Sequence, residues 1–204
     1  MDLSPRALSV AARNLALNEI TNVKLVQGDL YGRLGDATFD LVLANPPFVA
    51  SPDVRLAFRD GGPLGDRTLM PILEELPQRL NPGGICQVVT VLYELEGNSQ
   101  LEALEAFAHD RELEVLVLSG PPGDRYDLAR KQYRDTIRDH QRYRESVMAY
   151  LDHLDRIGLQ SWFSCVISVR KGETGKFERR ETIGRTVQFE VDDVVQQRSF
   201  FGMP

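Results

Sequence analysis

The run Phe39-Asp40-Leu41-Val42-Leu43-Ala44 constrains the fold more than any other segment of the chain. It is nearly all apolar, which is typical of a central parallel strand that is buried on both faces. Asn45-Pro46-Pro47 follows at once and must end the strand, because proline cannot donate a hydrogen bond to a neighbouring strand. A Gly/Pro-rich loop that contains residues 60–65 comes next. The segment therefore predicts a sheet with a sharp loop at the carboxyl end of one strand.

Further strands and helices alternate along the chain. Ser4 is suited to cap a first helix that begins at Pro5 and ends near Asn18. Asn81-Pro82-Gly83-Gly84 is a strong stop signal for a later helix. Strand-like runs cover 23–27, 85–92, 113–118 and 162–169, and helical periodicity covers about 67–80 and 98–110. This alternation predicts an α/β doubly wound fold, with a parallel sheet and helices on both faces.

Composition excludes several classes of protein. The chain has 204 residues, which fits one ordinary domain with appendages. It contains no run of about 18 apolar residues and no signal-peptide pattern, so we expect no membrane span and a cytoplasmic location. Cys86 and Cys165 lie in apolar runs without metal-ligand spacing, which predicts two buried thiols and no metal site. The net charge of −6 argues weakly against a protein that coats nucleic acid.

Polar residues follow the predicted strands at the points where a ligand would bind. In open α/β sheets, ligands bind beyond the carboxyl ends of the strands. Asp2 precedes the first helix, Asp29 follows the run at Val23, and Asn45 follows the run at Phe39. Each residue alone is more often an ordinary loop or terminal residue. Their order at successive strand ends favours a binding site.

Four motifs occur along these segments: Asp2-Leu3-Ser4-Pro5-Arg6-Ala7-Leu8, Gln27-Gly28-Asp29-Leu30, Phe39 to Phe48 with Asn45-Pro46-Pro47-Phe48, and Leu80-Asn81-Pro82-Gly83-Gly84. Together they resemble the class I S-adenosylmethionine-dependent methyltransferases, and specifically the amino-methylating methyltransferase small domain. The resemblance covers about residues 2–118 and the strand at Trp162, but neither the Arg-rich segment at about 126–156 nor the tail after Lys171.

The resemblance implies a role for each matching residue. Asp2, with Leu3 beside it, would accept hydrogen bonds from the ribose hydroxyls of S-adenosylmethionine. Asp29 would accept one from the adenine amine, with Leu30 against the ring. The substrate side would use Asn45, which also borders the cofactor, the carbonyl of Pro46, and Pro47 and Phe48. In this assignment Asn45 and Pro46 are the catalytic residues and Phe48 is a stacking platform for a planar substrate.

The chemistry of amine methylation gives the Asn45 assignment a physical reason. An amide or aryl amine is a poor nucleophile because its lone pair is delocalised. Acceptors at Asn45 and Pro46 that lie outside the amine plane would favour the pyramidal geometry of attack. That interaction strengthens toward the transition state, so it would be catalytic. Because the sulfonium methyl is already activated, positioning would supply much of the remaining acceleration, and no strong base is needed.

One departure from the family concerns the cofactor. The family's first strand and glycine-rich loop normally precede the residues seen here, and no GxGxG-like sequence occurs later in the chain. We therefore expect an N-terminally truncated methyltransferase domain over 1–170, with a helical insert at about 120–158 before the last strand and a polar extension over 171–204. Without the missing strand, the unit at 23–27 should not pair normally with the strand at Phe39. The chain as printed should bind S-adenosylmethionine weakly or not at all.

The polar segment from Tyr126 to about Arg156 is predicted to be helical. Arg130, Arg134, Arg138 and Arg142 recur every four residues, which would place them along one side of a helix. One interpretation is a clamp that binds either phosphates or the acidic surface of a protein. The other is a solvated helix with ion pairs, and this interpretation is favoured. His109, His140 and His153 are expected to be solvated surface residues. In the tail, we expect one edge strand around 186–191.

The sequence thus predicts an S-adenosylmethionine-dependent N-methyltransferase that acts on a protein amide or amine, or on a base amine in RNA. The alternative is a catalytically inactive remnant or an interaction module that lacks the cofactor loop. A nicotinamide dehydrogenase with the same topology is a weaker rival, because hydride transfer gives Asn45-Pro46-Pro47-Phe48 no task. The sequence leaves the oligomeric state open.

Overall fold

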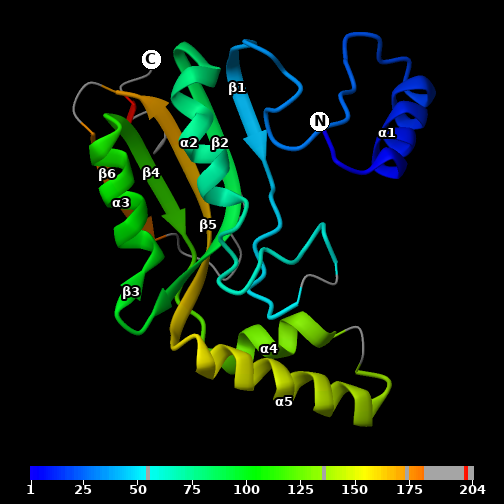
Figure 1. Cartoon of the computed structure of the whole chain (residues 1–204), viewed down its shortest axis with the longest axis vertical. Coiled ribbons are helices and arrows are strands. Elements are labelled where there is room, and N and C mark those ends of the chain that lie inside the picture. The colour runs from blue at the N-terminus through cyan, green and yellow to red at the C-terminus, as the bar shows by residue number, and fades with distance from the viewer. Residues whose placement is uncertain (54–55, 135–136, 173–174, 182–199, 202–204) are drawn as a thin grey trace.

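The computed structural model describes residues 1–53, 56–134, 137–172, 175–181 and 200–201. Figure 1 shows a twisted sheet, helices packed against it, and an N-terminal helix set apart from it. The elements in chain order are α1 Pro5–Leu17, β1 Phe39–Ala44, α2 Leu69–Arg79, β2 Leu80–Leu95, β3 Asn98–Ser99, α3 Gln100–Asp110, β4 Leu113–Ser119, α4 Arg125–Tyr133, α5 His140–Arg156, β5 Leu159–Lys171 and β6 Phe177–Glu181.

The sheet has the order β1-β2-β5-β4-β6, and β3 forms a short hairpin with β2. β1 pairs with β2 in parallel and β6 pairs with β4 in parallel, but β5 runs antiparallel to both β2 and β4. The α/β prediction is confirmed, whereas the prediction of a wholly parallel sheet is wrong for β5. The reason is that α4 and α5 return the chain to the edge at which β4 ended, so the next strand must run back. Helices were also expected on both faces, but α2 and α3 pack on the same face, and of the helices named above only α4 and α5 reach the other, at one end of the sheet.

One face of the sheet packs against α2 and α3 (Figure 1). Val115 and Val117 of β4 point into this core together with Leu73 of α2 and Leu104 of α3. The neighbouring residues of β4, Leu116 and Leu118, point to the opposite face, where they pack against Phe200 and Phe201. β4 is therefore buried on both faces, as an inner strand should be.

β1 is an edge strand, which contradicts the expected central position. Among the described strands it pairs with β2 alone. Val42 and Ala44 pack against the core, but the alternate residues Leu41 and Leu43 are 55% and 68% exposed. The apolar run is thus buried on one face only, because no described segment covers the other.

The N-terminal segment stands apart from the sheet, and its helix α1 buries no residue (Figure 1). The expected cap is present, since the Ser4 hydroxyl accepts a hydrogen bond from the Ala7 amide at 3.3 Å and Asn18 is the C-cap residue. The expected strand at 23–27 does not form, and only Gln27 makes a parallel bridge, to Asp2. An isolated extended run without a longer partner cannot build a ladder.

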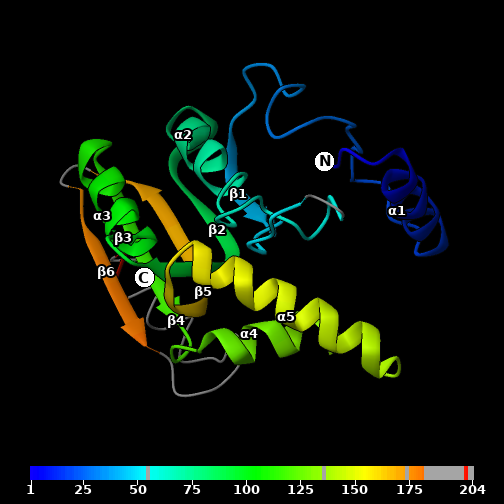
Figure 2. The ribbon, with the colours of Figure 1, turned by 60° about the horizontal axis from the view of Figure 1, so that its bottom comes forward.

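The inserted helices α4 and α5 lie side by side at one end of the sheet (Figure 2). The helical prediction is confirmed, but the arginines do not share one helix. Arg130 lies on α4 and Arg142 on α5, and Arg134 and Arg138 fall at the connection between them. Asp139 caps the second helix through the Arg142 amide at 3.1 Å, so the periodic spacing is broken by a helix start.

The region after residue 170 adds strand β6 to the sheet, and its Phe200 and Phe201 pack against Leu116 and Leu118 of β4. The Phe200 carbonyl accepts a hydrogen bond from Lys176 Nζ at 3.0 Å. The expected edge strand around 186–191 lies outside the described residues, and the sequence interpretation missed β6. No described helix has the length and apolarity that a membrane crossing needs.

Candidate active site

Asn45 leaves the carboxyl end of β1 and lies beside a hollow of about 410 Å³ in the sheet face. The hollow is mostly apolar and has two amide side chains on its wall, and its lining consists of Leu43, Ala44, Asn45, Gln87, Val89 and Val166. Asn45 is exposed, and its side chain makes no hydrogen bond with the described residues. Its amide oxygen is therefore available as an acceptor toward a ligand.

Pro46 is buried, whereas Pro47 and Phe48 are half-buried. Phe48 packs against an apolar cluster that joins the end of β2 to the inserted helices, and that cluster contains Tyr93, Tyr150 and Trp162. The predicted substrate-side residues thus change from exposed to anchored within four positions. An exposed Asn45 followed by anchored residues suits a loop that presents the Asn45 amide at a fixed place.

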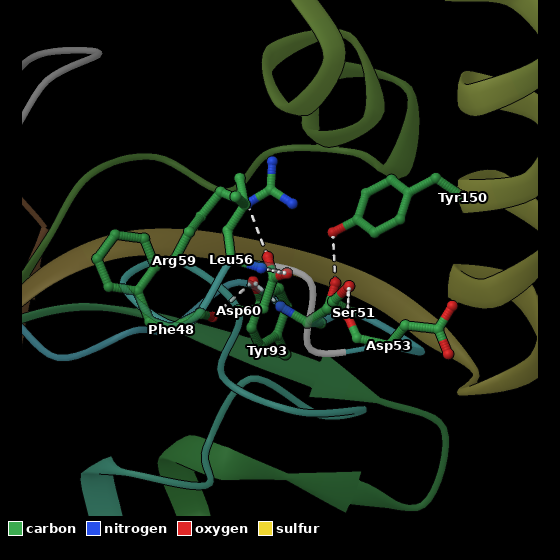
Figure 3. Close-up of polar contacts among 9 residues, drawn as sticks. Phe48, Ser51, Asp53, Leu56, Arg59, Asp60, Tyr93 and Tyr150 are labelled. Carbon is green, nitrogen blue, oxygen red and sulfur yellow. Dashed lines mark hydrogen bonds and ion pairs between the residues drawn. The ribbon is translucent and has the colours of Figure 1, made fainter. Parts of the chain in front are cut away.

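The loop after Phe48 is tied down by Tyr93 of β2, whose side chain is fully buried (Figure 3). The Tyr93 hydroxyl donates to the Phe48 carbonyl at 3.1 Å and accepts from the Ala50 amide at 3.1 Å. Burial raises the pKa of Tyr93 above its ordinary range. The hydroxyl therefore stays protonated near neutral pH and keeps the proton that it donates.

Two glycines allow the loop to close on itself. A Cβ on Gly61 would lie 2.7 Å from the Pro47 carbonyl oxygen, and one on Gly65 would lie 2.4 Å from the Phe48 carbonyl oxygen. Gly65 also has a φ of +74°, which favours glycine. Contacts below 3 Å cannot be accommodated without displacing the backbone. The glycine-rich segment therefore shapes the candidate site, beyond being loop punctuation.

Asp60 is a structural carboxylate within this loop. It is buried, and it accepts hydrogen bonds from the Leu56 amide at 2.9 Å and from Arg59 Nε at 2.7 Å (Figure 3). A buried carboxylate is stable only when such partners are present. Asp60 thus closes the turn at 56–60, and the neighbouring Val49 amide donates to the Arg59 carbonyl at 2.9 Å.

The inserted helix α5 also holds the loop, which the sequence interpretation missed. The Tyr150 hydroxyl donates to the Ala50 carbonyl at 2.8 Å, and His153 Nε2 lies 3.0 Å from the Pro63 carbonyl oxygen. The prediction of a solvated His153 is wrong, since its side chain is buried, whereas His109 and His140 are exposed as expected. The apolar spacing Tyr150, Leu154, Ile157 places His153 on the inner face and could have revealed it.

The predicted cofactor residues lie in the N-terminal segment. Asp2 accepts a hydrogen bond from the Ser4 amide at 2.7 Å, and its main chain bonds to Val26 and Gly28. Asp2 and Asp29 are both exposed, and Leu3 is 61% exposed. Leu30 has a φ of +46° and packs in part against the main core.

The structure therefore brings the predicted site residues together in two groups. Asp2 is paired with Gln27, close in the chain to Asp29, and Asn45 to Phe48 are continuous at the end of β1. Neither Asp2 nor Asp29 lines the hollow beside Asn45. The carboxylates of Asp2 and Asp29 nevertheless fit the chemistry of the cofactor, because exposed carboxylates accept hydrogen bonds from hydroxyl and amino groups.

Cys86 and Cys165 are free, buried thiols, as predicted. Burial raises the pKa of Cys86 to about 12, and it raises that of Cys165 still further. Both are therefore protonated and unreactive near neutral pH. Within the described ranges, no cluster of three or more His, Cys, Asp or Glu side chains could hold a metal ion.

Comparison with known proteins identifies the class. The family model of the methyltransferase small domain matches residues 1–104, half of the chain. The chain belongs to this family, whose members are S-adenosylmethionine-dependent methyltransferases, so the resemblance found in the sequence is confirmed.

The chain is similar to two bacterial relatives with curated descriptions. The ribosomal protein uL3 glutamine methyltransferase of Bradyrhizobium diazoefficiens is 39% identical over 102 residues, which cover 43% of this chain and 32% of the relative. The release factor glutamine methyltransferase of Caulobacter vibrioides is 32% identical over 133 residues, which cover 54% of this chain and 46% of the relative. The matched stretches thus span about a third to a half of these relatives.

A solved structure supports the fold. A candidate sarcosine dimethylglycine methyltransferase from Galdieria sulphuraria superimposes with a TM-score of 0.56 at 14% identity, covering 85% of this chain and 69% of the other. At that identity the likeness concerns the fold alone. It confirms the Rossmann-like architecture of the sheet and its helices.

Proposed function

We propose that this protein is an N-methyltransferase that transfers the methyl group of S-adenosylmethionine to the side-chain amide of a protein glutamine. The observation that carries the proposal is the Asn45-Pro46-Pro47-Phe48 loop at the carboxyl end of β1, with the Asn45 amide open toward a hollow. The family match and the two relatives named for glutamine methylation support it. A protein amide is favoured over an amine because both relatives carry that substrate in their names.

The loop residues would act on the amide nitrogen of the substrate. The Asn45 side-chain oxygen and the Pro46 carbonyl would accept its two N–H groups, and this pairing draws the nitrogen toward pyramidal geometry. Phe48 would pack beside the planar amide. These interactions strengthen as the nitrogen bonds to the methyl carbon, so they lower the barrier. The C–S bond would break with its electron pair remaining on sulfur, and the nitrogen would release one of its two protons to solvent. When bound, S-adenosylmethionine supplies a methyl group already activated on its sulfonium, and Asp2 and Asp29 would hold its ribose and adenine.

Two alternatives are weaker. An RNA base amine would favour a phosphate clamp, but Arg130 and Arg142 lie on different helices and Arg130 is ion-paired with Asp127. An inactive interaction module would not require an open amide at Asn45. A cytoplasmic location remains part of the proposal and suits relatives named for a ribosomal protein and a release factor.

The test uses the protein expressed from its complete natural reading frame, with methyl-labelled S-adenosylmethionine. Release factor, ribosomal protein uL3 and bulk RNA from the same organism are offered in separate reactions, and the product is mapped by mass spectrometry. We expect label on a glutamine side-chain nitrogen of one of the proteins. Label on an RNA base, or on a nitrogen other than a glutamine amide, would contradict the proposal.

A further inference from the structure

The main-chain N–H and C=O of Ala50 are each bound by a tyrosine hydroxyl, from two different parts of the fold. Figure 3 shows the two tyrosines, Tyr93 and Tyr150, beside the loop. The Ala50 amide donates to Tyr93 of β2 at 3.1 Å, and the Ala50 carbonyl accepts from Tyr150 of α5 at 2.8 Å. Ala50 is fully buried, and Tyr150 is 2% exposed. Ala50 stands two residues after Phe48, so this pair of bonds fixes the backbone directly after the Asn45-Pro46-Pro47-Phe48 loop.

The Tyr150 bond is not replaceable by water, because both partners are buried. A buried carbonyl without a donor is costly, so the loop and the helix each require the other in this arrangement. The Tyr150 ring also packs edge-to-face on Tyr133 of α4, with 5.6 Å between ring centroids. Burial raises the pKa of Tyr150 above its ordinary range, so its hydroxyl keeps the proton that it donates.

A second attachment lies one turn further along the same helix. His153 Nε2 lies 3.0 Å from the Pro63 carbonyl oxygen. A carbonyl can only accept a hydrogen bond, so Nε2 carries the proton in this pair. Helix α5 therefore holds both arms of the loop, near Ala50 and near Pro63, and the Ser51 amide joins these arms through the Gly62 carbonyl at 2.8 Å.

The helix that makes these contacts lies outside the family match, which ends at residue 104. We propose that Tyr150 is a positioning residue for methyl transfer: by holding the Ala50 carbonyl, the inserted helix keeps Phe48 and the Pro46 carbonyl in place for the substrate amide. This inference rests on the proposed function. Tyr150 is buried and its hydroxyl is bound to the Ala50 carbonyl, so in this proposal it acts through the loop.

The test uses the protein expressed from its complete natural reading frame. It compares Tyr150→Phe with Tyr143→Phe, a matched change on the same helix at a half-buried tyrosine. Tyr150→Phe keeps the apolar ring and removes only the hydroxyl. We expect amide hydrogen exchange over residues 48–65 to rise about 10-fold, with little change over β4. Turnover should fall about 10-fold while affinity for S-adenosylmethionine stays unchanged. Tyr143→Phe should match the wild type in all three measurements.

A second pair guards against a folding defect in Tyr150→Phe. His153→Leu removes the bond to Pro63, whereas His153→Gln retains an N–H donor of similar reach. We expect faster loop exchange and lower turnover in His153→Leu, and recovery of both in His153→Gln.

The outcomes separate the two proposals. Unchanged loop exchange in Tyr150→Phe and His153→Leu would overturn the anchoring. Faster exchange with wild-type turnover would overturn the positioning role. Absence of methyl transfer in the wild type would refute the proposed function, and the positioning role of Tyr150 with it, while the exchange data would still report whether the helix anchors the loop.

Discussion

The N-terminal segment and the inserted helices differ in how they are attached to the molecule. Helix α1 buries no residue, and its segment is joined to residues 26–28 through Asp2 and to the main core through Tyr31. Helix α5 buries Tyr150, His153 and Leu154, and two of these bind the loop at 48–63. The segment with the predicted cofactor motif is thus loosely packed, whereas a segment without any motif is built into the core.

The residues that could contact ligands are therefore different from the residues that hold the loop in place. Asp2, Asp29 and Asn45 are exposed polar residues that could contact ligands, and they contribute little to the core. The residues that fix the loop around the site are tyrosines, glycines and a histidine that belong to no motif. Substitutions in the two regions should therefore have different consequences for stability.

The largest expected effect comes from truncating the buried face of α5. Leu154 is fully buried, so Leu154→Ala should lower the free energy of unfolding by about 2–5 kcal/mol. Leu17 of α1 is 78% exposed, and Leu17→Ala should change it by less than about 0.5 kcal/mol. Urea unfolding of both variants checks the contrast. Equal losses would mean that α1 is packed as firmly as α5.

Substituting two glycines that have positive φ should lower the free energy of unfolding by a smaller amount. Gly35→Ala has open space around its new Cβ, so it should lower that free energy by about 1 kcal/mol, for the left-handed backbone alone. Gly65→Ala adds the contact with the Phe48 carbonyl and should cost about 1–3 kcal/mol more. Thermal unfolding measures both variants, and a similar loss in each would show that the loop can yield at Gly65.

The smallest expected effect is the dependence of the free energy of unfolding on pH through His153. Burial lowers the pKa of His153 below 6.5, with Arg156 acting in the same direction and the Pro63 bond and Asp53 opposing it. The unfolded chain therefore binds the proton first as pH falls, so the contribution of His153 to stability is present above about pH 6.5 and is lost below it, by at most about 1.4 kcal/mol per pH unit.

His153→Gln does not titrate and serves as the reference for this effect. We expect the wild type to lose stability faster than His153→Gln between about pH 6.5 and 5. The measurement is urea unfolding at several pH values. Parallel curves for the two proteins would show that the buried histidine does not titrate differently in the folded and unfolded states.

Local signals predicted much of the fold. Ser4-Pro5 marks the start of α1, the Asn81-Pro82 signal follows the end of α2 at Arg79, and Asn45-Pro46 follows the end of β1. The direction of β5 was not predictable, because an apolar run does not indicate whether a strand lies parallel or antiparallel to its neighbours. The run at 23–27 has strand propensity, yet propensity without a partner strand does not make a sheet.

In the candidate site, too, the sequence predicted the consecutive motif residues but not the contacts between distant segments. The motif predicts the location of Asn45 and its neighbours, because it depends on consecutive residues. The anchors at Tyr93 and Tyr150 are separated from Ala50 by 43 and 100 positions, so their hydrogen bonds follow from the tertiary fold. Only the helical spacing around His153 offered a local signal for the inner face of α5.

The central claim is that the loop beginning at Asn45 performs methyl transfer to a protein amide. Its most direct test is Asn45→Ala in the protein expressed from its complete reading frame, with turnover measured on the protein substrate and S-adenosylmethionine affinity measured by calorimetry. We predict that turnover falls by about 10²–10³-fold while cofactor affinity stays nearly unchanged, since the lost interaction belongs to the transition state. Near wild-type turnover in Asn45→Ala would contradict the account.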